Sequence, residues 1–107
     1  MMRLCVIAAL TAATLSAAYE QRLALAIQAQ SQFDRVELAA AAPDLRDTIQ
    51  CTQAQAALLP VALPEELAAL HYRKGFCTLA GAAITRNTAQ FADAAAEFAI
   101  PASPSAA

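Results

Sequence analysis

The side chains that could carry chemistry gather in one run, His71-Tyr72-Arg73-Lys74. His71 is the only histidine of the chain, and a nucleophile such as Cys77, six positions away in a helix, would lie on a different face. We therefore expect no catalytic residue in this run. Its aromatic and cationic side chains favour contact with another protein or peptide, and we take His71, Tyr72 and Arg73 as the partner-binding candidates.

Two alternatives for this run stay open. In the first, Arg73 and Lys74 form a solvated helix edge that pairs with Glu65, Glu66 or another neighbouring acid, while Tyr72 is a core residue with a polar rim. In the second, Arg73, Lys74 and Glu66 hold a small anion in an all-helical enzyme.

Acidic residues occur in pairs at helical spacing, which places both members of a pair on one face. General acid–base catalysis also needs burial and a pocket, and the sequence indicates neither, so the pairs predict solvated faces. One histidine and few cysteines do not complete a closed zinc site, and no glycine-rich phosphate loop is present. The sequence therefore predicts no metal, no cofactor and no enzyme activity. The pairs are Asp34/Glu37, Asp44/Asp47 and Asp93/Glu97.

The first eighteen residues have the pattern of an export signal. Arg3 follows two methionines, residues 4–15 are apolar or small, and Ser16-Ala17-Ala18 fits the rule for cleavage after Ala18. The apolar run is shorter than the roughly 20 residues of a membrane span. We expect residues 1–18 to be a signal peptide and the mature chain to be periplasmic or secreted. An uncleaved anchor and a buried N-terminal helix are the alternatives.

Cysteine usage fits export. Cys5 would leave with the signal peptide, and the even pair that remains, Cys51 and Cys77, predicts one disulfide. In an ideal hairpin the two would be about 8 Å out of step along the helices, whereas a disulfide needs Cα atoms within about 7 Å. A displaced loop could correct the mismatch. Two separate buried thiols are the alternative.

The remaining sequence indicates helix throughout, because good helix formers dominate and no segment alternates as a strand does. We expect a single all-α domain over residues 19–100 and a loose Ala/Ser/Pro tail over residues 101–107. Prolines between the helices favour antiparallel hairpins, stacked as an array or a small bundle. The five expected helices cover residues 18–30, 32–42, 44–59, 64–85 and 88–98.

Capping and spacing add detail. Ser31, with Asp34 three residues on, resembles a capping box that should begin the second helix, and Asn87, with Gln90 three residues on, should begin the fifth. The fourth helix is apolar on two sides, so we expect it between the third and the fifth, with Gly81 either allowing close approach or ending the helix early. The residues expected to face inward are Tyr19, Leu23, Ala26 and Ile27 in the first helix, Phe33, Val36 and Ala40 in the second, Leu45, Ile49, Thr52, Ala56 and Leu59 in the third, and Phe91, Ala94, Ala95 and Phe98 in the fifth.

The spacing of Phe91, Ala94 and Phe98 resembles the second helix of a tetratricopeptide repeat, and Gly75 resembles the small position of the first helix. Between Gly75 and Phe91 the chain has about seven residues more than that repeat. The resemblance implies helical hairpins that serve as a binding scaffold rather than as an enzyme. A fainter match covers Ile27, Phe33 and Ala40.

Composition narrows the function further. The net charge is −2 with 15% charged residues, so no basic stripe is available for nucleic acid. We expect a small exported helical module for protein interaction or assembly. A periplasmic stress or chaperone-like protein stabilised by one disulfide is the alternative. A third possibility is the start of a longer repeat protein, whose last helix would leave an apolar face exposed.

Overall fold

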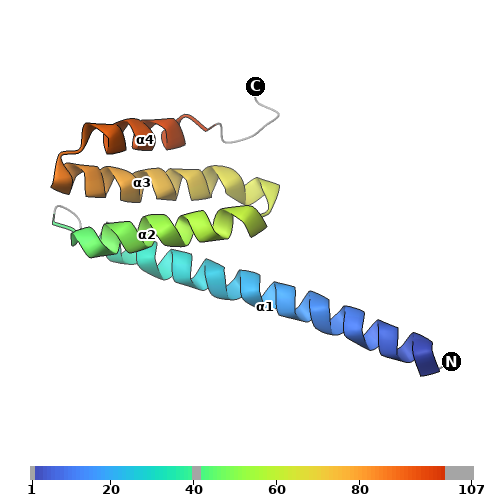
Figure 1. Ribbon diagram of the computed structural model, residues 1–107. Helices are drawn as coiled ribbons and strands as arrows, with labels where there is room; N and C mark the ends of the chain where they lie inside the picture. Colours follow the sequence, from blue (N-terminus) through green and yellow to red (C-terminus); the bar gives the residue numbers. More distant parts are fainter. Residues whose placement is uncertain (1, 40–41, 101–107) are drawn as a thin grey trace.

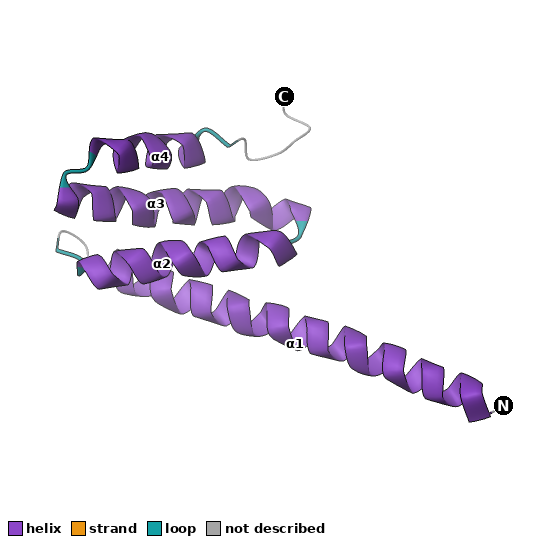
Figure 2. Ribbon diagram, viewed as in Figure 1, coloured by secondary structure: helices purple, strands orange, loops and turns teal. Residues whose placement is uncertain are grey.

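The part of the chain that the structure describes is helical. The structure is a computed structural model that describes residues 2–39 and 42–100, with side chains from residue 17 onward. Within those residues there is no strand (Figure 2), so the all-α prediction is confirmed, with four α-helices rather than five. The elements are α1 (Met2–Ala39), α2 (Leu45–Leu58), the 3₁₀ turns η1 (Leu59–Val61) and η2 (Pro64–Glu66), α3 (Leu67–Thr85) and α4 (Thr88–Phe98).

α3 is the central helix, as expected for the helix at residues 64–85. It packs against α2 on one side and α4 on the other, and the chain reverses direction between these three helices (Figure 1). α1 packs mainly on α2, crosses it obliquely and extends beyond the other helices at its N-terminal end. None of the helices in the described ranges is both long and apolar enough to cross a membrane. The expected tail at 101–107 and the side chains of residues 1–16 lie outside the description.

The predicted helix break at Ser31 is wrong, because α1 continues through it to Ala39. No proline or glycine interrupts residues 18–39, so the backbone hydrogen bonds of the helix continue without a gap. The Asp34 carboxylate, expected to complete the cap, instead accepts a hydrogen bond from Gln30 Nε2 at 2.8 Å. This is an i, i+4 pair on the helix surface.

α1 buries Phe33 and Val36, as predicted for residues 32–42, but its earlier part does not bury the predicted face. Tyr19, Leu23 and Ile27 are 64%, 46% and 62% exposed, and α1 instead buries the neighbouring face that carries Ala29. Phe33 anchors that face, since its ring meets Phe76 edge-on at 5.5 Å between centroids. The buried positions are Ala29, Phe33 and Val36.

The disulfide between Cys51 and Cys77 is present and joins α2 to α3, with the two Cα atoms 6.0 Å apart. Both cysteines are fully buried beside Phe33 and Val36. The register problem expected from an ideal hairpin is reduced by η1, which prolongs α2. Counting both 3₁₀ turns, the two cysteines lie about 16 and 21 Å from the connection, a difference of about 5 Å rather than 8 Å.

The disulfide also fixes how α2 is rotated. The seam predicted through Leu45 and Ile49 is wrong, because these side chains are 36% and 47% exposed. The buried side passes through Thr48, Cys51 and Gln55 instead. Gln55 is fully buried and its Nε2 donates to the Ala29 carbonyl of α1 at 2.7 Å. Gln55 therefore lies in the core because Cys51, one turn earlier on the same side of α2, must face α3 to form the disulfide.

Helix ends at the α3–α4 connection match the prediction. α3 runs through Gly81 to Thr85, so an early end at Gly81 is wrong, and Arg86 terminates the helix in the left-handed region at φ 56°. Asn87 caps α4, where its Oδ1 accepts from the backbone N–H groups of Ala89 and Gln90 at 3.0 and 3.3 Å. The turn between the helices is thereby as short as predicted.

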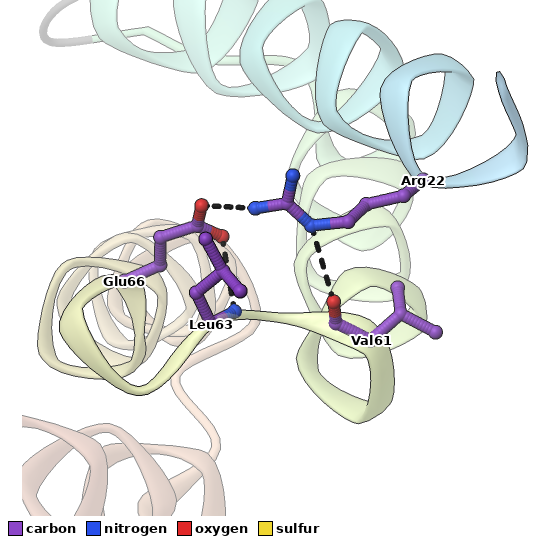
Figure 3. A network of polar contacts seen from close by, with 4 residues as sticks. All are labelled: Arg22, Val61, Leu63 and Glu66. Carbon is purple, nitrogen blue, oxygen red and sulfur yellow. Dashed lines mark hydrogen bonds and ion pairs between the residues drawn. The ribbon is translucent and has the colours of Figure 1, made fainter. Parts of the chain in front are cut away.

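Arg22 fastens α1 to the connection between α2 and α3 (Figure 3). Its Nε donates to the Val61 carbonyl at 3.2 Å, and its guanidinium pairs with the Glu66 carboxylate. Glu66 also accepts from the Leu63 N–H at 3.4 Å, which closes the first turn of η2. One arginine thus holds the end of the α2–α3 layer against α1.

Candidate functional site

Ionisable side chains converge where α3 and α4 pack together. His71 Nδ1 lies 2.5 Å from Glu97 Oε2, and Lys74 Nζ lies 2.9 Å from Glu97 Oε1. His71 and Lys74 are one turn apart on α3, so both side chains reach the Glu97 carboxylate, which lies in the last turn of α4. Gly75 permits this approach, because a Cβ there would lie 3.0 Å from both Glu97 Cβ and Phe98 Cε1.

The Glu97 carboxyl is held in its charged form. Burial raises its pKa, but the hydrogen bonds and charges of Lys74 and His71 outweigh burial, so the pKa lies below its ordinary value of 4.5. An ionised carboxylate only accepts hydrogen bonds, so His71 carries its hydrogen on Nδ1. At neutral pH the Glu97 carboxylate is an anion that pairs with two side chains of α3, and the cluster therefore joins the two helices.

The three partner-binding candidates do not form one surface. Tyr72 is 56% exposed, so its prediction as a core residue is wrong, and its ring lies 5.6 Å from that of Phe98. His71 turns to Glu97. Arg73 points to α1, where its guanidinium lies 5.4 Å from the centre of the Phe33 ring. Of the three, Tyr72 is the side chain with most of its surface available to a partner.

The anion site suggested by Arg73, Lys74 and Glu66 does not assemble. Glu66 pairs with Arg22, Lys74 pairs with Glu97, and Arg73 lies over an aromatic ring. Lys74 therefore pairs with a neighbouring acid, as one alternative expected, and that acid is Glu97. No group of His, Cys, Asp and Glu side chains in the described residues is arranged to hold a metal ion.

α4 forms the open edge of the helical layer. Its inner side is marked by Ala94, which is 1% exposed, but Phe91 and Phe98 are 41% and 40% exposed rather than inward. Phe98 packs beside Gly75 and Tyr72 of α3, so the rings flank the contact with α3, and the outer side of α4 carries mainly alanines. The sequence contained a signal for this open side, because alanines occur all around the helix. The exposed ones are Ala89, Ala92, Ala95, Ala96 and Ala99.

A groove runs over α3 between α2 and α4. It consists of two adjoining hollows of about 330 and 410 Å³ that share Thr52, Thr78 and Gln90. One end is apolar, with Leu45 and Ile49, and the other holds Lys74, Asp93 and Glu97. Thr52 and Thr78 donate their hydroxyl hydrogens to carbonyls of their own helices. Their oxygens therefore remain as acceptors toward the groove.

Comparisons with protein families, with curated proteins and with solved structures find no match to this chain. The resemblance to tetratricopeptide repeats stays a prediction. Of its residues, Ala94 is buried and Gly75 lies at a close helix contact. Phe33 and Ile27, however, belong to one unbroken helix, and Ala40 lies outside the described residues.

Proposed function

We propose that this chain is a small exported helical module that binds another protein through the edge formed by α4. The observation that carries the proposal is the exposure of Phe91 and Phe98 beside the small-residue side of α4. Aromatic anchors surrounded by small residues are typical of interaction surfaces, and a helix without long side chains can be approached closely by another. The partner best suited to this edge is an amphipathic helix.

Tyr72 extends the same surface. Its ring packs against Phe98, and 56% of its area is exposed. Tyrosine provides a large rigid contact area and a hydroxyl for hydrogen bonding, both common in interfaces. We define the α4 edge by its three aromatic side chains, Tyr72, Phe91 and Phe98.

Export is part of the proposal. The pattern of residues 1–18 and the buried disulfide between Cys51 and Cys77 both favour an oxidising compartment. N-terminal sequencing of the exported protein should find Tyr19 as the first residue. A mature protein that starts at Met1 would refute cleavage.

The α4 edge can be tested with a photo-crosslinking amino acid at Ala92. The captured protein is identified, purified and titrated against the unmodified chain. Phe98→Ala and Phe91→Ala should each weaken binding at least about tenfold. Leu38→Ala on α1 is the matched control, because Leu38 is an aliphatic side chain that is 83% exposed and lies elsewhere. Equal weakening by the control, or none by the phenylalanine variants, would refute the α4 edge.

A stress or chaperone-like role is the second candidate. The specific observation is that α4 is held to α3 through the ionised Glu97, which acid would neutralise. Acid would then loosen α4 and expose apolar surface to unfolding clients. Binding of a hydrophobic dye should rise between neutral pH and about pH 3. No change in dye binding would count against this role.

A further inference from the structure

α1 and α2 line an open hollow that carries amide side chains and borders the groove over α3 at Gln53. Its volume is about 400 Å³, within the range of small-ligand sites. Gln28 and Gln32 of α1 face Gln50 and Gln53 of α2 across it, and Leu25, Ala54 and Ala57 provide apolar surface. The site uses no residue of the α4 edge.

The amides converge because of helical spacing. Gln28 and Gln32 are four positions apart on α1, and Gln50 and Gln53 are three apart on α2, so each pair lies on one face. α1 stays helical through Ser31, which keeps Gln28 and Gln32 in line. The continuity of α1, which the sequence did not indicate, is therefore what assembles the site.

The chemistry of the lining defines the ligand. None of the lining residues carries a charge, so nothing there favours an ion. Each amide presents both donors and an acceptor. Gln32 Oε1 is shielded from solvent and has no hydrogen-bond partner among the described residues, so a ligand donor would satisfy it once the side chain turns toward the hollow.

We propose that this hollow binds a neutral, polyhydroxylated ligand, one or two rings of a saccharide. Each sugar hydroxyl both donates and accepts, which matches the amides, and the C–H face of a ring can lie on Leu25 and the two alanines. The lining residues span about 10 Å along either helix, which suits a compact ligand. An extended peptide would place only about three residues in that length.

The test is a titration of the ¹⁵N-labelled chain with maltose and with diacetylchitobiose, and separately with blocked trialanine. We expect saturable shifts of the glutamine side-chain amide signals with at least one sugar, at a dissociation constant of about 1 mM. Gln32→Leu should weaken binding about tenfold. Gln30→Leu is the matched control, since Gln30 is exposed on the other side of α1 and should leave binding unchanged.

Several outcomes would overturn the proposal. They are an absence of saturable shifts with both sugars, shifts with blocked trialanine alone, and equal weakening by Gln32→Leu and Gln30→Leu. Because leucine is a good helix former, neither substitution should disturb α1. Circular dichroism of both variants checks that the fold is retained before the affinities are compared.

Discussion

His71 Nδ1 and Glu97 Oε2 lie 2.5 Å apart, although 26 positions separate the two residues in the chain. Lys74 completes the contact on the other carboxylate oxygen. These bonds and the contact between the tilted rings of Tyr72 and Phe98 hold α4 in place, since α3 is the helix against which α4 packs. The geometry of the proposed α4 edge therefore depends on one carboxylate.

Glu97→Gln keeps the shape of the side chain and removes its charge. We expect the free energy of unfolding at neutral pH to fall by about 1 kcal/mol, because the ion pair with Lys74 and the charge-assisted bond to His71 both lose the negative charge of the acceptor. Urea unfolding followed by circular dichroism measures the change. Glu37→Gln, an exposed site on α1, is the control and should have no effect. A similar loss in both variants would indicate a general charge effect instead.

The Glu97 contribution should depend on pH. Its pKa in the folded chain lies below the ordinary 4.5, so between these values the unfolded chain binds more protons. The stabilisation is therefore complete above the ordinary value and disappears as the pH falls through the folded pKa. The difference in unfolding free energy between the wild-type chain and Glu97→Gln should shrink from neutral pH to about pH 3. A difference that is independent of pH would contradict this origin.

The disulfide should contribute more than any single polar contact. It links residues 26 positions apart, and closing a loop of that length stabilises by about 3.5 kcal/mol in the chain-entropy description. The double variant Cys51→Ala/Cys77→Ala should lose about this amount in urea unfolding. Adding a reductant should destabilise the wild-type chain and leave the double variant unchanged. Equal stability of the two proteins without reductant would show that the bond is dispensable.

Local sequence signals predicted the parts of the fold that depend on local bonds. α3 ends at Thr85 and Asn87 caps α4 where expected, while Pro64 begins the 3₁₀ turn η2 that leads into α3 at Leu67, since proline and capping side chains act on the nearest turn of backbone. The cysteine pair was also predicted, because its count and spacing are visible in the sequence. None of these signals depends on how a helix is rotated about its axis.

Helix rotation was not predictable in the same way. Alanine is abundant on all sides of the helices, so several faces look equally apolar, and the choice among them falls to a few contacts between distant residues. Cys51 fixes the rotation of α2, and Phe33 anchors the buried face of α1. The pairing of Glu97 with His71 and Lys74 was missed for the same reason. The spacing of an acidic pair along one helix does not show whether either carboxylate faces solvent or a cation on the neighbouring helix.

Gly81 should resist the substitution that normally stabilises a helix. Alanine is favoured over glycine within helices by about 1 kcal/mol, but a Cβ at Gly81 would lie 3.0 Å from Thr48 Oγ1. Thr48 is buried, and its hydroxyl donates to the Leu45 carbonyl at 2.7 Å, so it has little freedom to move. We expect Gly81→Ala to destabilise by about 1 kcal/mol.

The Gly81 prediction can be checked with a double-mutant cycle. Thr48→Ala makes room, so Gly81→Ala should be less destabilising, or stabilising, in the Thr48→Ala background. Thermal unfolding of the four proteins gives the coupling energy. Additive effects of the two substitutions would show that the close approach of α2 and α3 is not the cause.

Gln55 presents the opposite case, a polar residue whose removal should be tolerated. Its Nε2 bonds the Ala29 carbonyl, but its Oε1 is buried without a partner in the described residues. The Ala29 carbonyl lies within α1 and keeps its helical hydrogen bond when the amide is lost. Gln55→Met therefore removes an unsatisfied acceptor and leaves no new one, and we expect a change between zero and about 1 kcal/mol of stabilisation.

Two substitutions make the Gln55 prediction decisive. Gln55→Glu has the same shape but would bury a charge, so it should destabilise by several kcal/mol, about 3 or more. Gln53→Met is the exposed control on the same helix and should be neutral. If Gln55→Met instead loses more than about 1 kcal/mol, the bond to Ala29 contributes more than the unpaired oxygen costs. The amide would then be a principal contact fixing α1 on α2, and the hollow between these helices would depend on it.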